Sequence, residues 1–141
     1  NDIVLMDAPS GLSYGLELAA RMTQEILMVA TPDDSSLRDA ERTAAVLAAY
    51  EKPRPMLVVN RIQQRFVAEG LQYGPEVCAQ LLDMRLAGVI PEDREAMRCT
   101  LRREVMHGAF PAMWALENLV ERLDDMNVPL LPWHEEAGSM V

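Results

Sequence analysis

Three groups of polar side chains that could bind a ligand follow short apolar runs in this sequence. Asp7 follows the apolar residues 3–6, Asn60 and Arg61 follow residues 56–59, and Glu92 comes two positions after the run 86–90. Carboxylate, amide and guanidinium groups supply hydrogen-bond donors, acceptors and charges of both signs. Their repeated placement after apolar runs favours a binding site for a polar ligand.

A tight turn is predicted directly after Asp7. Pro9 and Gly11 favour such a turn, and a glycine lets the backbone approach a ligand closely. Each of these residues also has a structural interpretation. Asp7 could cap a turn at the end of a strand, Gly11 could be an ordinary turn glycine, and Asn60 could cap a loop. The local sequence leaves these alternatives open.

The apolar runs predict strands that are buried in a parallel sheet. Strands covered on both faces are continuously apolar, and this pattern occurs at residues 3–7, 26–30, 56–59 and 86–90. Helices are predicted between and after them, at residues 12–22, 36–50, 75–82, 94–105 and 110–123, with a loop and one helical turn at 63–73 and a short strand at 128–133. The sequence therefore predicts an α/β fold with helices on both faces of a mostly parallel sheet and right-handed crossovers.

The predicted sheet would gather the polar residues at one edge. The carboxyl ends of parallel strands meet there, and open α/β sheets bind ligands at that edge. Thr31 and Asp93 also follow apolar runs and belong to the same set. We therefore expect one ligand site formed by several strand ends.

Other residues are predicted to start or pack helices. Ser36 with Asp39 matches a capping box, and Asp93 is placed to cap the helix that follows it. Two apolar stripes are expected to face the core. They are Leu37, Ala40, Ala44, Leu47 and Ala48 in the helix at 36–50, and Met113, Leu116, Val120 and Leu123 in the helix at 110–123.

Composition narrows the classes of function. The 141 residues are enough for one domain, and their net charge of −9 argues against binding to nucleic acid or to an anionic membrane surface. Cys78 and Cys99 do not form a disulfide framework and are predicted to be buried thiols in a reducing cytoplasm, while His107 and His134 lack the spacing of a metal site. The chain starts two residues before an apolar run, so we expect it to be part of a longer protein.

Four motifs appear in an order that resembles a known family. They are D-A-P-S-G-L from Asp7, T-P-D-D-S-S-L-R-D-A-E-R from Thr31, V-V-N-R-I from Val58 and L-A-G-V-I-P-E-D from Leu86. Together they resemble the C-terminal half of the MinD/ParA family of deviant-Walker-A P-loop ATPases. The resemblance covers residues 1–98, and residues 99–141 are expected to add a helix and a tail to the same domain. It implies an ATPase that dimerises around ATP and helps to place the division septum.

The resemblance also implies roles for individual residues. Asp7 matches the Walker B aspartate, which holds Mg²⁺ through water, and Gly11 matches the glycine that senses the γ-phosphate. Asn60 matches the position that contacts adenine. The remaining implied nucleotide contacts are Pro9 beside the switch glycine, and Arg61, Pro91 and Glu92 around the base and ribose.

The sequence departs from the family at the phosphate site. None of its seven glycines forms a G-x-G or G-K motif, and its one lysine, Lys52, stands between Glu51 and Pro53. The phosphate-binding loop and the strand that carries it in the family are absent from the sequence, so the sheet is expected to be incomplete. The family binds ATP and Mg²⁺, but we expect this chain alone to bind neither tightly and to be inactive.

Expectations about partners follow from the same comparison. The family implies MinC-like and MinE-like partners, and the unpaired edge of the strand at 3–7 predicts a homodimer, swapped or non-native, that buries this edge. Membrane binding is in doubt because residues 132–141 are acidic and lack a basic amphipathic helix. We expect a cytoplasmic protein, or one peripheral to the inner face of the membrane when it is full-length. The alternatives are an interaction module of the same fold without a nucleotide, and a DNA-partitioning protein, which the negative charge disfavours.

Overall fold

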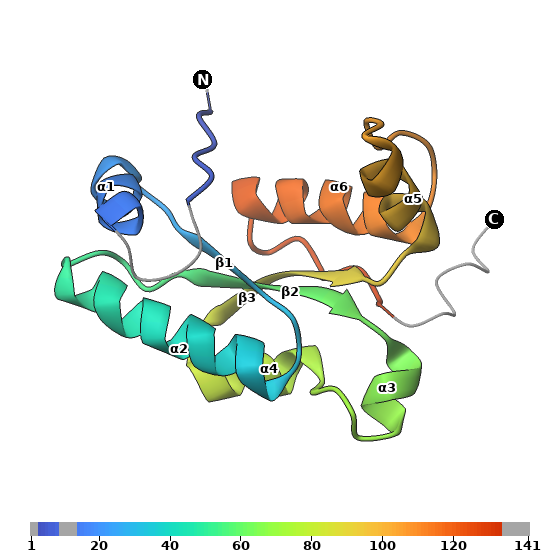
Figure 1. The fold of residues 1–141 in the computed structure, drawn as a ribbon, viewed down its shortest axis with the longest axis horizontal. Coiled ribbons are helices and arrows are strands. Elements are labelled where there is room, and N and C mark those ends of the chain that lie inside the picture. Colours follow the sequence, from blue (N-terminus) through green and yellow to red (C-terminus); the bar gives the residue numbers. More distant parts are fainter. Residues whose placement is uncertain (1–2, 9–13, 134–141) are drawn as a thin grey trace.

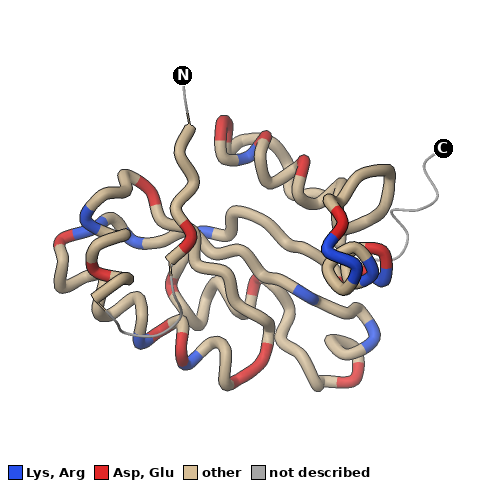
Figure 2. Tube along the Cα trace, turned by 45° about the horizontal axis from the view of Figure 1, so that its top comes forward, with Lys and Arg blue, Asp and Glu red and all other residues tan. Residues whose placement is uncertain are grey.

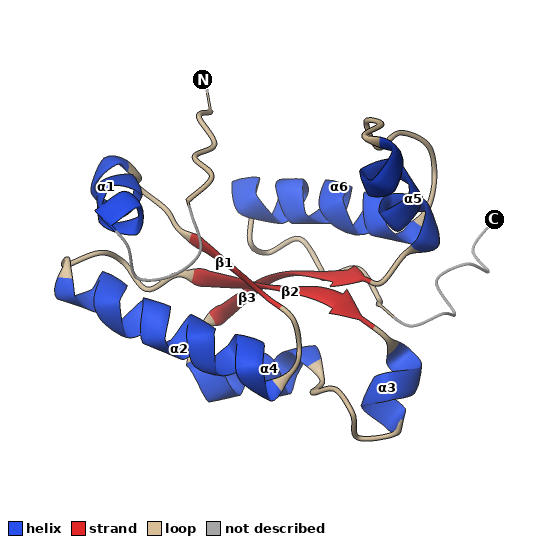
Figure 3. Ribbon diagram, viewed as in Figure 1, coloured by secondary structure: helices blue, strands red, loops and turns tan. Residues whose placement is uncertain are grey.

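A parallel sheet of three strands forms the centre of the described chain (Figures 1 and 3). The computed structural model describes residues 3–8 and 14–133. Its strands are β1 (Leu27–Ala30), β2 (Met56–Ile62) and β3 (Arg85–Pro91), in the spatial order β1-β2-β3. Both pairs of neighbouring strands are parallel. The predicted α/β fold with a parallel sheet is therefore confirmed.

Helices cover both faces of this sheet. In Figure 1, α2 and α4 lie on one side of the strands, and α6 lies on the other. The helices described are α1 (Tyr14–Met22), α2 (Asp34–Ala49), α3 (Gln64–Ala68), α4 (Pro75–Leu82), α5 (Arg94–Arg102) and α6 (Pro111–Asp124). The helix predicted at 75–82 has the expected bounds and carries proline at its first turn.

The central strand β2 is buried on both faces, which explains its unbroken apolar sequence. Leu57 and Val59 pack into the larger core, to which α2 and α4 contribute. Val58 points to the opposite face, where it packs with Ala87 and with Leu119 of α6. Each of these side chains is less than a tenth exposed. A strand in this position requires apolar residues at every position rather than at alternate ones.

The strand predicted at 3–7 is not formed. Residues 3–8 are irregular and exposed, and the apolar side chains of Ile3, Val4 and Leu5 are more than 80% accessible. A strand needs a hydrogen-bonded neighbour, and the described sheet pairs only β1, β2 and β3. The strand predicted at 128–133 is also absent, because Pro129 and Pro132 lack the N–H that a sheet ladder needs. Its Trp133 packs against the larger core instead.

The start of α2 and the end of α5 differ from the prediction by two or more residues. Helix α2 begins before Ser36, and its N-cap is Asp33, whose carboxylate accepts a hydrogen bond from the Ser36 N–H at 3.0 Å. Asp39 is therefore not part of a capping box and lies 3.9 Å from Arg42 in an exposed ion pair. Helix α5 ends at Arg102, because Arg103 has a φ of 57° in the left-handed region.

The predicted core stripe of α6 was partly wrong. Leu123 packs against the cluster of Val58, Ala87 and Leu119, and Met113 and Leu116 are half-buried, but the fully buried face is a different one. The buried face consists of Ala112, Ala115, Leu119 and Arg122, whereas Val120 is 67% exposed. Leu119 faces the sheet where the helix lies very close to it, at Gly88. A Cβ atom added to Gly88 would lie 3.0 Å from Cδ1 of Leu119. The glycine at this position therefore leaves the space that the Leu119 side chain occupies.

Arg122 is buried against an irregularity in β3. The register of β2 and β3 shifts after Leu57, which pairs with Leu86, because Val58 pairs with Gly88 and leaves Ala87 as an extra residue. The guanidinium of Arg122 donates hydrogen bonds to the carbonyls of Leu86 at 2.9 Å and Ala87 at 2.7 Å. It also donates to the carbonyl of Val128. A charged side chain outside the predicted apolar stripe thus joins α6 to the sheet.

Candidate functional site

The carboxyl ends of β2 and β3 bring four of the predicted site residues together. Asn60 pairs with Ile90 across the two strands, and Ile62 pairs with Pro91. Arg61 and Glu92 therefore lie beside each other at the same edge of the sheet. The sequence prediction that these strand ends share one edge is confirmed, while the roles of the residues there stay predictions.

Arg61 is the extra residue of a second β-bulge. The register shifts between Asn60 and Ile62, and Arg61 has a φ of 61° in the left-handed region. Such a conformation is unfavourable for a residue with a Cβ atom, and bulges of this kind redirect side chains. Ile62 consequently returns to the core, where it is 1% exposed, whereas the Arg61 side chain extends into solvent.

An ion pair joins the two strand ends. Nε of Arg61 lies 2.7 Å from Oε2 of Glu92, and the Glu92 side chain is 21% exposed. The hydrogen bond to this carboxylate raises the pKa of the Arg61 guanidinium. The Glu92 N–H donates to the carbonyl of Ile62 at 2.9 Å. Both the backbone and the side chain of Glu92 therefore bind it to the end of β2. Both charged groups therefore have a defined position at the edge.

A third residue, Gln72, supports this edge and was missed in the sequence. Its Oε1 accepts a hydrogen bond from the Gln63 N–H at 2.8 Å, and its Nε2 donates to the carbonyl of Arg61 at 3.3 Å. It comes from the loop after α3, within the polar segment predicted as a loop with one helical turn. Nothing in that segment distinguishes Gln72 from its polar neighbours, so no sequence signal could have found it.

Asp93 has the structural role predicted for it. Its Oδ1 accepts hydrogen bonds from the N–H groups of Glu95 and Ala96 at the start of α5. Its Oδ2 accepts from the N–H of Ala112 in the first turn of α6 at 3.2 Å. One carboxylate thus anchors two helices to the end of β3, and both of its oxygens accept backbone hydrogen bonds.

The end of β1 is also occupied by structural contacts. The hydroxyl of Thr31 donates to Oδ2 of Asp33 at 2.5 Å. This bond, followed by the one from the Ser36 N–H, lowers the pKa of the Asp33 carboxyl. Tyr73 links the neighbouring loop to this end, because its N–H donates to the carbonyl of Pro32 at 3.0 Å. These residues shape the site without offering a free charge to it.

Asp7 is not carried by a strand of the described sheet. It belongs to the exposed segment 3–8, which contributes nothing to the three strands. Pro9 and Gly11 lie outside the described residues. Among the described residues, no three His, Cys, Asp or Glu side chains are grouped as metal ligands. Lys52 donates to the backbone carbonyls of Arg21 and Thr23, and it precedes β2 at the opposite end from Asn60.

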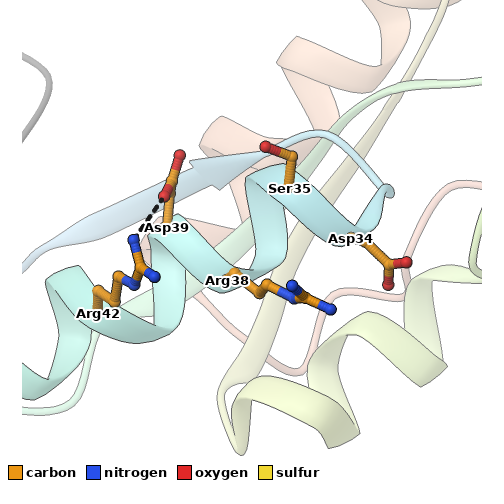
Figure 4. A pocket seen from close by; sticks show the side chains of 5 residues that line it. All are labelled: Asp34, Ser35, Arg38, Asp39 and Arg42. Atoms are coloured by element: carbon orange, nitrogen blue, oxygen red, sulfur yellow. Dashed lines mark ion pairs between the residues drawn. The ribbon is translucent and has the colours of Figure 1, made fainter.

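A shallow charged depression lies on the first turns of α2 (Figure 4). It has a volume of about 360 Å³ and is lined by Asp34, Ser35, Arg38, Asp39 and Arg42. Figure 4 shows Arg42 reaching toward Asp39, while Arg38 extends from a different side of the helix. Charges of both signs are also dispersed over the rest of the described chain (Figure 2), which is not the continuous basic stripe of a nucleic-acid surface.

The remaining sequence expectations concern the thiols and membrane spans. Cys78 and Cys99 are both buried and free, as predicted. Burial raises the pKa of the Cys78 thiol to about 11. Within the described ranges, every helix is too short or too polar to cross a bilayer.

Known proteins resemble the chain in both sequence and fold, although no family model matches it. The septum site-determining protein MinD of Synechocystis is 31% identical over 144 aligned residues, which cover 99% of this chain and 54% of that protein. MinD in the MinC:MinD cell division protein complex of Aquifex aeolicus has a TM-score of 0.82 at 31% identity, over 91% of this chain and 54% of that one. MinD of Pyrococcus horikoshii, solved with Mg-ADP, has a TM-score of 0.71 at 25% identity, over 86% of this chain and 49% of that one.

These similarities are consistent with the four sequence motifs and with the parallel sheet. The chain spans about half the length of the curated relatives that it matches. The agreement over nearly the whole chain, in sequence and in fold, identifies it as a homologue of the C-terminal half of the MinD proteins.

Proposed function

We propose that this chain is part of a MinD-like ATPase that takes part in placing the division septum. The names and the coverage of its relatives support this function. The observation that carries the proposal is the convergence of Asn60, Arg61, Pro91 and Glu92 at adjacent strand ends. Open α/β sheets bind ligands at this edge.

These four residues would form the base and ribose half of a nucleotide site. The Asn60 amide can both donate to and accept from the edge of adenine. The planar Arg61 guanidinium and the Pro91 ring can flank the base, and the half-buried Glu92 carboxylate can accept from a ribose hydroxyl. Arg61 would remain paired with Glu92, which limits the freedom of both groups before the ligand arrives.

The phosphate half of the site does not fit this chain. No glycine-rich loop with a lysine is present in the sequence, and Lys52 is bound to backbone carbonyls at the other end of β2. In the full-length protein, Asp7 would hold Mg²⁺ through water, and the turn with Pro9 and Gly11 would approach the γ-phosphate. We infer that the 141 residues alone neither hold ATP tightly nor hydrolyse it.

A nuclear magnetic resonance titration with AMP, Mg-ATP and GMP tests both halves of this proposal. AMP and Mg-ATP should shift the amide signals of Asn60, Arg61 and Glu92 with the same dissociation constant, of about 1 mM or weaker, which corresponds to about −4 kcal/mol. GMP should bind more weakly, because its base presents a different edge to Asn60. Micromolar binding of Mg-ATP would contradict the missing phosphate half, and unshifted strand-end signals with AMP would contradict the base half.

The alternative function is an interaction module that kept the fold without a nucleotide. The reading frame upstream of Asn1 separates the two. A K-G-G-x-G-K-T-like motif in that frame supports the ATPase, and a start codon at this point with no such motif supports the module.

A MinC-like partner is supported by the complex of the Aquifex relative. The charged face of α2 is a suitable contact surface, because Arg38, Asp39 and Arg42 are exposed on one rigid helix. Arg38→Glu should weaken binding to an immobilised MinC protein, whereas Arg65→Glu on α3 should not. Equal retention of the two variants would exclude this surface. MinE-like partners and a peripheral membrane location remain proposals that rest on the family resemblance.

A homodimer is also proposed, with residues 3–6 in its interface. Ile3, Val4 and Leu5 are each more than 80% exposed, and β1 is an edge strand of the described sheet with Val29 60% exposed. Apolar extended segments and open sheet edges favour pairing between chains. Sedimentation velocity at rising concentration should show a dimer, and a monomer at all concentrations would contradict this proposal.

A further inference from the structure

The loop that carries Gln72 is fixed by its own backbone. The carbonyl of Phe66 in α3 accepts hydrogen bonds from the N–H groups of Leu71 at 2.8 Å and Gln72 at 3.1 Å. Gly70, with a φ of 73°, makes the reversal that this arrangement requires. The next residue, Tyr73, is bound to the carbonyl of Pro32 after β1. The Gln72 side chain therefore starts from a rigid point between the ends of β1 and β2.

From this point the Gln72 amide reaches both sides of the strained residue Arg61. It donates to the Arg61 carbonyl at 3.3 Å and accepts from the Gln63 N–H at 2.8 Å. The left-handed conformation of a non-glycine residue persists only where its surroundings determine it. Three neighbours fix the φ of Arg61 here: the bulge between β2 and β3, the Glu92 carboxylate and the Gln72 amide. Of these, Gln72 alone comes from outside the two strands and the turn after β3.

We propose that Gln72 is a positioning residue for base recognition, acting through Arg61. The inference rests on the proposed nucleotide site at this edge. Gln72 holds the left-handed backbone of Arg61, which directs the guanidinium to Glu92 and places it beside the base that Asn60 contacts. Without the Gln72 amide, the Arg61 backbone relaxes toward an ordinary extended conformation, and the Arg61 side chain moves away from the Glu92 carboxylate.

Three variants of the chain test this role. Gln72→Ala removes both hydrogen bonds, and Gln72→Glu keeps an acceptor for the Gln63 N–H but loses the donor to the Arg61 carbonyl. Gln80→Ala is the matched control, because Gln80 is an exposed glutamine on α4. The readouts are hydrogen exchange of the Gln63 amide, the three-bond coupling that reports φ of Arg61, and the affinity for AMP, with circular dichroism to confirm the fold.

The two Gln72 variants should differ in a specific way. Gln72→Ala should speed exchange of the Gln63 amide about tenfold, change the Arg61 coupling and weaken AMP binding about fivefold, as expected for the loss of neutral hydrogen bonds. Gln72→Glu should preserve the slow exchange of Gln63 but still change the Arg61 coupling and weaken AMP binding. Gln80→Ala should change none of these.

The outcomes separate this inference from the proposed function. If Gln72→Ala leaves the Arg61 coupling unchanged, or Gln72→Glu restores AMP affinity without the donor, the positioning role is overturned. If the unaltered chain does not bind AMP, the proposed base site fails and the role of Gln72 in base recognition fails with it. The Gln63 exchange and the Arg61 coupling would still measure whether Gln72 holds the backbone conformation of Arg61.

Discussion

Replacing the buried Arg122 of α6 with leucine should destabilise the fold. The side chain is 9% exposed, and its guanidinium satisfies the carbonyls of Leu86, Ala87 and Val128. Leucine removes all three hydrogen bonds. Ala87 is completely buried, so water cannot replace the lost donor at its carbonyl.

The magnitude follows from these contacts. A buried carbonyl that loses its partner costs about 1–3 kcal/mol, and leucine regains part of this by filling apolar space without burying a charge. We expect a loss of about 3 kcal/mol in the free energy of unfolding, or a fall of about 10 °C in Tm for a chain of this size. Arg122→Lys should lose less than Arg122→Leu, because a lysine ammonium still donates hydrogen bonds, although from one nitrogen in place of the three nitrogens of the guanidinium.

Urea and thermal unfolding followed by circular dichroism measure this effect. The matched control is Arg102→Leu, since Arg102 is an exposed arginine in the last turn of α5 and should change stability by less than about 0.5 kcal/mol. If Arg122→Leu unfolds within 0.5 kcal/mol of the unaltered chain, the bulge at Ala87 does not depend on the guanidinium, and the reasoning is refuted.

Two further predictions concern the core. Gly88→Ala should cost about 1–3 kcal/mol in urea unfolding, because its Cβ would lie 3.0 Å from Leu119, and the added presence of Leu119→Ala should make the same glycine substitution cheaper. Additive effects in the double variant would contradict that contact. The folded pKa of Cys78, about 11, lies above its unfolded value near 9. The buried neutral thiol therefore contributes fully to the free energy of unfolding below pH 9. This contribution should fall by about 1.4 kcal/mol per pH unit as the pH rises from 9 toward 11. Cys78→Ala should show a flatter stability profile over this interval, and equal slopes would contradict the burial effect.

The sequence was most informative where local pattern and burial coincide. The run at 56–59 is apolar throughout because β2 is covered on both faces, and Pro75 marks the first turn of α4 because its missing N–H has no partner to lose there. Asn60 and Glu92 could be placed at one edge because parallel strands point the same way. These features depend on short segments and on one rule of sheet geometry.

The sequence was uninformative where structure depends on contacts between distant residues. The α6 stripe was partly wrong because Leu119, which lies outside it, packs on Gly88 of β3, and this contact joins residues far apart in the chain. The bulge at Arg61 and its support by Gln72 have the same origin. Glycine would have indicated a positive φ in the sequence, but an arginine such as Arg61 does not.

The apolar run at 3–7 shows the same dependence in its strongest form. Its composition is that of a buried strand, yet Ile3, Val4 and Leu5 remain exposed because strand formation requires a neighbour to supply the other half of each hydrogen bond. Propensity alone cannot satisfy these backbone groups. Asp7 therefore belongs to an exposed, irregular segment that is not part of the described sheet.

The base half and the phosphate half of the proposed site thus have different structural requirements. The contacts described for the Arg61 end of the sheet come from β2, β3, the turn after β3 and the loop with Gln72, all of which are folded here. The position of Asp7 depends on a strand neighbour that the described sheet does not provide. Base recognition can therefore be complete while phosphate recognition is absent. Because binding free energy then comes from the nucleoside alone, additional phosphates should add nothing to affinity, which is why AMP and Mg-ATP are expected to bind this chain equally.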